Sequence, residues 1–226
     1  MQKIKPMEKK QYFDTSKGLP IKQPALWKVL VSRLCFPVLA LLSRENSLKI
    51  GLTPIDDERV IMVLKFAKGR VLDIGCGANN FVHSYPQKGI GVDVYPWQGV
   101  DVVVKSAAKL PFEKGKFKTV TYIACLNHIP NRAESLKEAS RVTTEDGRVI
   151  VTMVSPLWGR FIHWLRFKND PDHQDRDIDH DHELLGMHST HVRSLMKDAG
   201  FVHIRQKRFV FGINTVYIGD KINPNK

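Results

Sequence analysis

Strand-like and helix-like segments alternate along the chain from residue 55 onward, and this alternation constrains the fold more than any other feature. The strand-like segments are residues 70–75, 89–94, 100–104, 118–126, 147–154, 201–212 and 213–221. The helix-like segments are residues 54–67, 78–85, 131–142 and 188–200, with Asn131 as the expected N-cap of the third. Such alternation predicts an α/β fold with a mostly parallel sheet and helices on both faces. The last two strands are joined by a very short link, which requires an antiparallel pair and predicts one reversed strand near the C-terminal edge.

The residues before position 55 differ in character from this pattern. Residues 1–23 hold six lysines against two acids, which predicts a basic arm. Residues 25–42 are strongly apolar but contain Lys28, Arg33 and Pro37, so they are too short and too charged for a membrane span. Two interpretations stay open for them: a cap helix packed on the domain, or peripheral attachment to a membrane surface helped by the basic arm. We therefore expect an N-terminal part at 1–54 and a single domain at 55–226.

The charge and the cysteines limit the partners and the compartment. The net charge is +12, yet residues 170–183 hold seven acids against one arginine, so the rest of the chain carries about +18. That surplus favours an anionic partner (nucleic acid, anionic lipid or a phosphorylated substrate) without choosing among them. Three widely spaced cysteines and a polar start without a secretory signal predict a reducing, cytoplasmic location.

The first strand of the alternating region ends in "VLDIGCG", and ligands of parallel sheets bind at the carboxyl ends of strands. Gly75 and Gly77 allow a backbone to turn closely around a ligand, and Asp73 lies beside them. Asp93 follows Asp73 by twenty residues, at the end of the next strand, where a carboxylate can accept hydrogen bonds from both hydroxyls of a ribose. The third glycine of a dinucleotide site is absent, because Gly77 is followed by Ala-Asn-Asn. An adenosine-containing cofactor without a pyrophosphate fits this loop better.

Four motifs in order resemble the class I S-adenosylmethionine-dependent methyltransferases. They are "VLDIGCGANNF", "GIGVDV", "AAKLPFEKGKFKTVTYIACLNHIPN" and "LKEASRVTTEDGRVIVT". The resemblance covers roughly residues 55–155, and its nearest members are of the small-molecule type. It implies a Rossmann-like sheet of seven strands and S-adenosyl-L-methionine as the cofactor.

The resemblance also assigns cofactor contacts by position. They are Asp73, Gly75, Cys76, Gly77, Asn79, Asp93, Val94, Tyr95, Ser106, Ala107 and Ala124. The first loop would surround the methionine end of the cofactor, and Asp93 would hold the ribose. Val94 and Tyr95 would flank the adenine, the residues at 106 and 107 would contact its edge, and the backbone of Ala124 would meet the methionine amine. The chain departs from the family at Asn79, often glycine, at Ser106, often acidic, and at Lys118, usually aspartate.

His128 is the candidate catalytic residue, because it follows the fourth strand in "CLNHIPN", where the family often has a histidine. One interpretation is a general base that removes a proton from the acceptor. The other is a residue that only orders the loop, since methyl transfer depends mainly on alignment. Cys125 lacks the neighbouring proline expected of a nucleophilic cysteine and is predicted to be a buried small side chain.

Residues 156–190 are predicted to form a substrate lid inserted after the fifth strand. The stretch contains "LWGRFIHWLRF", which suits an apolar or anionic acceptor, and then an acidic segment rich in histidine. The histidines are His173, His180, His182, His188 and His191. No two of them have the i, i+4 spacing of a helical metal site, so no metal is assigned. A solvated loop, an acceptor-recognition lid and a metal site all remain open for this segment.

Together these features predict a methyltransferase that acts on a small-molecule or lipid-like acceptor. RNA methylation is the first alternative, suited by the positive charge, but the loop after the fourth strand lacks the Asn/Asp-Pro-Pro-aromatic pattern used on exocyclic base amines. A non-catalytic cofactor-binding protein is the second, opposed by the intact acid and glycine positions. The oligomeric state is left open.

Overall fold

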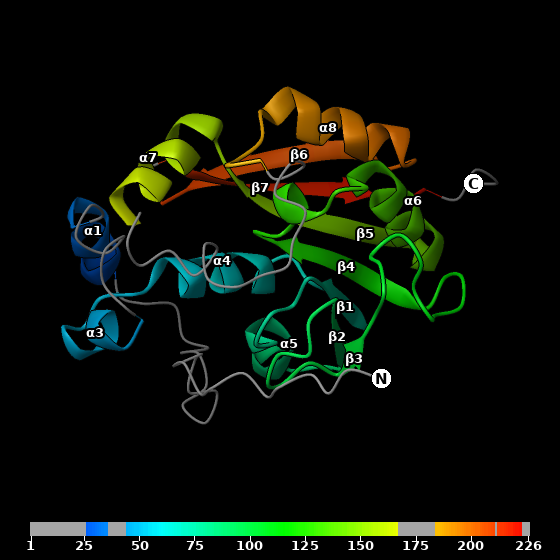
Figure 1. Ribbon diagram of the computed structural model, residues 1–226, viewed down its shortest axis with the longest axis horizontal. Helices are drawn as coiled ribbons and strands as arrows, with labels where there is room; N and C mark the ends of the chain where they lie inside the picture. Colours follow the sequence, from blue (N-terminus) through cyan, green and yellow to red (C-terminus); the bar gives the residue numbers. More distant parts are fainter. Residues whose placement is uncertain (1–25, 36–43, 167–183, 211, 223–226) are drawn as a thin grey trace, which may run out of the picture.

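The computed structural model describes residues 26–35, 44–166, 184–210 and 212–222 (Figure 1). Seven strands form one sheet in the order β3-β2-β1-β4-β5-β7-β6. They are β1 (Val71–Ile74), β2 (Gly89–Asp93), β3 (Val102–Val103), β4 (Phe117–Ile123), β5 (Thr143–Val154), β6 (Val202–Phe209) and β7 (Asn214–Asp220). β7 runs antiparallel to both of its neighbours, and every other pair is parallel. The predicted Rossmann-like sheet with one reversed strand is confirmed.

Helices cover both faces of the sheet, as predicted (Figure 1). They are α1 (Leu26–Leu34), α3 (Arg44–Lys49), α4 (Ile55–Leu64), α5 (Asn80–Ser84), α6 (Arg132–Val142), α7 (Pro156–Arg166) and α8 (Ser189–Asp198), with a 3-10 turn η2 (Leu126–His128). Buried residues of α6 and α8 belong to one apolar core, and those of α4 and α5 to a second. The two cores lie on opposite sides of the sheet.

The central strand β5 shows how the sequence builds these two cores. Val149 and Val151 pack in the core under α6 and α8, whereas Ile150 packs in the core under α4. All three are fully buried. Successive side chains of a strand point to opposite faces, so a continuous apolar run supplies both layers at once.

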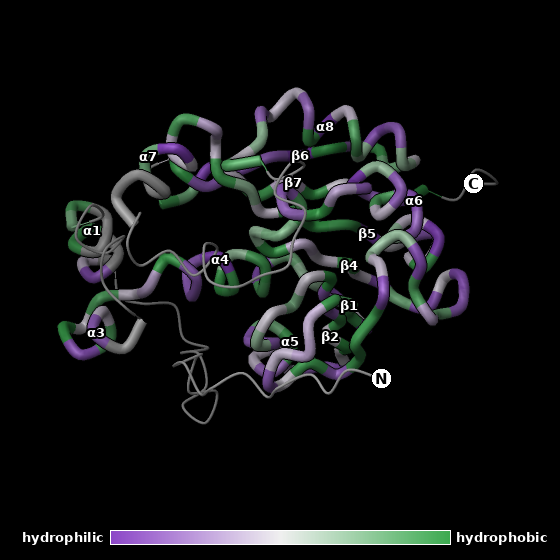
Figure 2. The backbone as a smooth tube through the Cα atoms, in the orientation of Figure 1, coloured by the Kyte–Doolittle hydropathy of each residue, from purple (hydrophilic) through white to green (hydrophobic). Residues whose placement is uncertain are grey.

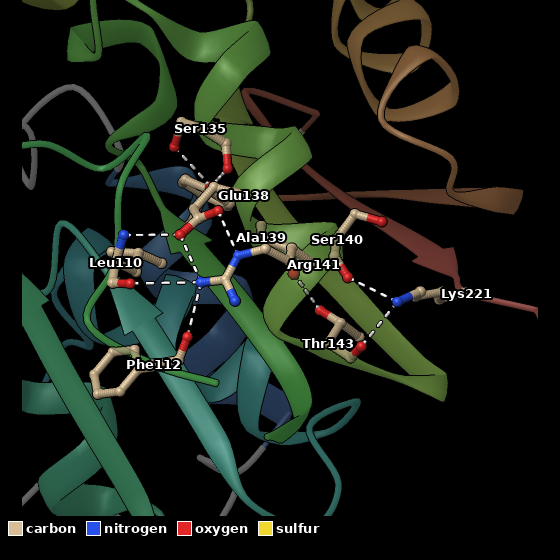
Figure 3. A network of polar contacts seen from close by, with 10 residues as sticks. Leu110, Phe112, Ser135, Glu138, Ala139, Ser140, Arg141, Thr143 and Lys221 are labelled. Carbon is tan, nitrogen blue, oxygen red and sulfur yellow. Dashed lines mark hydrogen bonds and ion pairs between the residues drawn. The ribbon is translucent and has the colours of Figure 1, made fainter. Parts of the chain in front are cut away.

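A polar network joins α6 to the loop between β3 and β4 (Figure 3). Arg141 donates to the backbone carbonyl of Phe112 at 2.8 Å and pairs with Glu138 at 2.8 Å. Glu138 in turn accepts the backbone N–H of Leu110 at 2.8 Å. The guanidinium lowers the pKa of the Glu138 carboxyl, so the pair stays charged. The network fixes the loop that carries Ser106.

Two local expectations differ from the structure. Asn131 occupies the N-cap position of α6 but makes no side-chain capping bond; its amide donates instead to the hydroxyl of Ser106 at 3.3 Å. β5 begins at Thr143 rather than at residue 147, because Thr143 pairs with Phe117 across a register shift in β4.

The apolar segment of the N-terminal part and the predicted lid each contain a helix. α1 is one helix within the apolar segment 25–42, and α7 lies within the predicted lid. Residues 36–43 and 167–183 lie outside the described residues. Of the helices in the described ranges, none is both long and apolar enough to cross a membrane. The division at residue 55, where α4 begins, stays a prediction.

Candidate active site

Asp93 joins the ends of β1 and β2 through its two carboxylate oxygens. Oδ2 accepts the backbone N–H of Gly77 at 2.9 Å, and Oδ1 accepts that of Tyr95 at 3.0 Å. The side chain is nearly buried, with 9% of the residue exposed. An ionised carboxylate offers about four lone-pair sites, so two are left for further donors. This geometry fits the two hydroxyls of a ribose.

Gly75 and Gly77 serve different purposes. Both have positive φ, +69° and +53°, where a side chain is strained. A Cβ on Gly75 would lie 2.8 Å from Sγ of Cys125, so this glycine lets the loop pack against the end of β4. A Cβ on Gly77 would meet no atom within 4 Å. The backbone of Gly77 therefore borders open space that a ligand can enter.

Asp73 is a buried acid at the centre of this edge of the sheet. Its Oδ1 lies 2.6 Å from the hydroxyl of Thr121 on β4. Burial raises the pKa of Asp73 to about 7, the negative charge of Asp93 adds to the rise, and the bond to Thr121 opposes it. The carboxyl is thus poised between its neutral and ionised forms near pH 7, and a cation placed beside it would favour ionisation.

Asn79 holds the glycine loop to the connection between β2 and β3. The residue is fully buried with φ +62°. Its Nδ2 donates to the carbonyl of Gly99 and to Oδ2 of Asp101, both at 2.9 Å. The same oxygen of Asp101 accepts the backbone N–H of Gly91 at 2.7 Å. The Asn79 side chain therefore positions the loop, and the direct cofactor contact expected for it stays a prediction.

Sequence reasoning missed Asp101. The acid stands in the strand-like segment 100–104, where its only signal was a charged residue before three valines. Gly91 completes the arrangement, because a Cβ there would overlap the amide of Asn79.

The residues assigned to the adenine follow β2 and β3. Val94 is half exposed, and the ring centroids of Tyr95 and Trp97 are 5.8 Å apart. The hydroxyl of Ser106 accepts the backbone N–H of Ala108 at 3.2 Å and the Asn131 amide, so it orders its own turn. Both lone pairs of this hydroxyl are in use, so an acceptor for the adenine amine would come from backbone groups near Ala107, as the missing acid predicts.

Ala124 and Cys125 follow the end of β4. The first was assigned to the methionine end of the cofactor and the second to packing. Ala124 has φ +53°, and its N–H is bound to Thr152. This leaves the carbonyl of Ala124 as the group for an amine. The thiol of Cys125 lies 2.9 Å from the carbonyl of Ile74, and burial raises the pKa of this thiol and of Cys76 well above the usual range. Neither thiol is set up as a nucleophile.

Asn127 determines the tautomer of His128. Nδ2 of Asn127 donates to the carbonyl of Leu184 at 2.9 Å and lies 2.9 Å from Nε2 of His128. Because Nδ2 is a donor at both contacts, Nε2 carries a lone pair and the ring proton lies on Nδ1. The nitrogen that faces Asn127 is therefore the one that can accept a proton.

Within the described ranges, no group of three or more His, Cys, Asp or Glu is arranged to hold a metal. Of the five histidines singled out in the sequence, His188 and His191 are described, and the other three fall in the segment outside the described residues. The metal interpretation of that segment stays untested.

Three comparisons relate this site to known proteins. A family model described as "Methyltransferase domain" matches residues 52–206, more than half of the chain. A ubiquinone/menaquinone biosynthesis C-methyltransferase of Desulfotalea psychrophila is 26% identical over an alignment of 181 residues that covers 68% of this chain and 74% of that protein. A chloroplastic tocopherol O-methyltransferase of Arabidopsis thaliana is 28% identical over an alignment of 127 residues that covers 47% of this chain and only 34% of that enzyme.

Solved structures share the fold. A SAM-dependent methyltransferase of Thermotoga maritima superposes with a TM-score of 0.53 at 21% identity, covering 73% of this chain and 94% of its own. A methyltransferase of Haloferax volcanii in complex with the Trm112 methyltransferase activator gives a TM-score of 0.59 at 14% identity, covering 83% and 98%. The glycine loop, the open space at Gly77 and the ribose-type acid fit S-adenosylmethionine. The chain belongs to the methyltransferase-domain family and is a class I S-adenosylmethionine-dependent methyltransferase.

Proposed function

We propose that this enzyme methylates a small apolar, lipid-like acceptor on oxygen, nitrogen or carbon. The observation that carries the proposal is a pair of hydrogen bonds between the loop of His128 and the insertion after β5. Nδ2 of Asn127 donates to the carbonyl of Leu184 at 2.9 Å, and the N–H of Leu184 donates back to the carbonyl of Asn127 at 3.2 Å. The candidate base and the insertion are therefore held together.

The insertion brings apolar side chains to this junction. Leu185 follows Leu184 in the insertion and packs against Gly159 of α7. The contact is so close that a Cβ added to Gly159 would overlap the backbone carbonyl of Leu185. At this junction Leu185 is 43% exposed. An apolar acceptor would gain binding free energy by burying its surface against such side chains, whereas a polar acceptor would gain little.

The names of the similar enzymes support the same acceptor class. One is named for ubiquinone and menaquinone biosynthesis, and the other for tocopherol. These compounds join a polar ring to an apolar tail. The present chain resembles those enzymes at 26% and 28% identity, so we extend to it the class of acceptor and no particular compound.

When bound, S-adenosylmethionine supplies the methyl group attached to its positively charged sulfur, and the sulfur keeps the electron pair of the broken bond. The glycine loop and Asp93 would hold the donor in place, and Asp73 in its ionised form would favour the positive charge nearby. His128 would exchange its contact with Asn127 for the acceptor and take the acceptor's proton on Nε2. Alignment of donor and acceptor provides most of the acceleration, and proton removal adds to it.

The test measures S-adenosylhomocysteine formation with two acceptors: a hydroquinone with an isoprenoid tail and the same ring without the tail. We expect kcat/KM to be at least about tenfold higher for the tailed compound, the difference expected from burying one to two apolar side-chain equivalents. Leu185→Asp should raise KM for the tailed acceptor alone. Val202→Asp, an exposed apolar position on β6, serves as the matched control.

Three results would contradict the proposal. Equal kcat/KM for the two compounds would show that the enzyme does not recognise the apolar tail. Turnover with RNA but with neither hydroquinone would support the RNA alternative, and cofactor binding without turnover on either acceptor or on RNA would support a non-catalytic role.

A further inference from the structure

α1 presents an apolar stripe to solvent. Trp27, Leu30, Val31 and Leu34 recur at the i, i+3, i+4, i+7 spacing of one helix face. Their exposed fractions are 61%, 57%, 38% and 79%. A surface helix of a globular protein normally turns such a stripe toward the core. Here the stripe is exposed, which marks an interaction surface.

α7 carries a second set of exposed apolar side chains. Leu157, Trp158 and Phe161 are exposed at 81%, 38% and 38%. The rings of Trp158 and Phe161 contact each other edge to face with centroids 5.8 Å apart. In Figure 1, α1 and α7 lie at the same end of the long axis of the molecule, together with α3, and Figure 2 shows hydrophobic turns on these helices. Two apolar helix faces therefore belong to one end of the molecule.

The charges of these helices have one sign. Their sequences, LWKVLVSRL and PLWGRFIHWLR, contain four lysines and arginines and no acid. Lys28 lies 5.6 Å from the ring centroid of Trp27, so a cation adjoins the stripe. In sequence, residues 1–25 add six lysines against two acids. A partner must therefore be apolar in part and negatively charged.

We propose that α1 and α7 form a membrane-docking face that binds an anionic lipid bilayer. The apolar side chains would enter the boundary between headgroups and acyl chains while the basic side chains bind lipid phosphates, which is how interfacial helices attach. Anionic lipid adds an attraction for each basic group near the surface. A second copy of the chain fits less well, because a two-fold contact would bring the basic groups of both copies together. The inference does not depend on which acceptor is methylated.

The test is flotation of the full chain with lipid vesicles. Phosphatidylcholine vesicles with about 30% phosphatidylglycerol should bind the protein, pure phosphatidylcholine should bind it far less, and about 0.5 M salt should weaken the anionic binding. Leu34→Asp and Leu157→Asp should each lower binding about tenfold, because each removes one large apolar side chain from the lipid. Ile222→Asp is the control: it is 45% exposed but lies outside both helices, so it should bind like the unaltered chain.

All three substitutions replace exposed side chains, so thermal unfolding should show the same midpoint within a few degrees and exclude misfolding. Three results would overturn the proposal. They are no binding to anionic vesicles, equal loss of binding in the control, and a dimer in sedimentation experiments that Leu34→Asp dissociates.

Discussion

The hydroxyl of Thr121 lies 2.6 Å from Oδ1 of Asp73, and the two buried residues pair with each other across the neighbouring strands β4 and β1. The hydroxyl is too weak a partner to offset the burial, so the pKa of Asp73 stays at about 7. A carboxyl with this pKa responds to any positive charge that enters the site. The raised pKa of Asp73 leads to one prediction on cofactor binding and one on stability.

Cofactor affinity should rise with pH. The carboxyl is about half protonated at pH 7 without ligand, and the positive charge of S-adenosylmethionine favours the ionised form, so binding releases a proton. Titration calorimetry at pH 6, 7 and 8 should show Kd falling and then levelling off above the pKa. Asp73→Asn should bind the cofactor more weakly, with a Kd that does not change with pH. If the Kd of the unaltered protein is also independent of pH, Asp73 does not interact with the cofactor.

Asp73→Asn should also stabilise the ligand-free protein at high pH. The folded-state pKa is about 7 and the ordinary value 3.8, so the folded state loses stability relative to the unfolded chain as pH rises from about 4 to 7. At pH 8 the full difference is of order 4 kcal/mol, from about 1.4 kcal/mol per pKa unit. Urea unfolding at pH 8 should show the variant as the more stable protein, and the difference should shrink toward pH 4.

Asp93→Ala should weaken cofactor binding by about 1.5–3 kcal/mol, which is roughly a 10- to 150-fold higher Kd. The substitution removes the oxygens that would meet the ribose and also frees the N–H of Gly77. Calorimetry with nicotinamide dinucleotide as the control ligand measures the specificity of the site. An unchanged Kd for S-adenosylmethionine would contradict the ribose assignment.

At position 79, alanine should destabilise the fold more than glycine does. Both substitutions remove the bonds to Gly99 and Asp101, but only alanine is strained at φ +62°, by about 1–2 kcal/mol. Chemical unfolding of Asn79→Gly and Asn79→Ala separates the two effects. Equal stability would show that the left-handed backbone relaxes in the alanine variant.

His128→Ala should bind cofactor with unchanged Kd and lose about 100-fold in kcat, the lower range for a general base. His128→Gln keeps a polar group for Asn127 but cannot take the proton, so it should be equally slow. A glutamine variant with full activity would assign His128 to ordering the loop.

The sequence predicted the sheet well because its signals are local. A run such as VLDI bounded by glycines indicates a buried strand, and the short link at Gly212 requires the reversed strand. Local signals of this kind do not predict side-chain contacts between residues that are distant in the sequence. Asn131 was a sound N-cap by type, yet Ser106 lies close enough to take its amide, and nothing near Asp101 announces that it meets Asn79.

The position of β7 has a consequence for how the chain reaches its native state. β7 follows β6 in the chain but lies between β5 and β6 in the sheet, where it pairs with seven residues of β5. During synthesis β6 leaves the ribosome before the strand that links it to the sheet exists. β6 can therefore join the sheet only after translation of β7, and the edge of β5 stays open to wrong pairing until then.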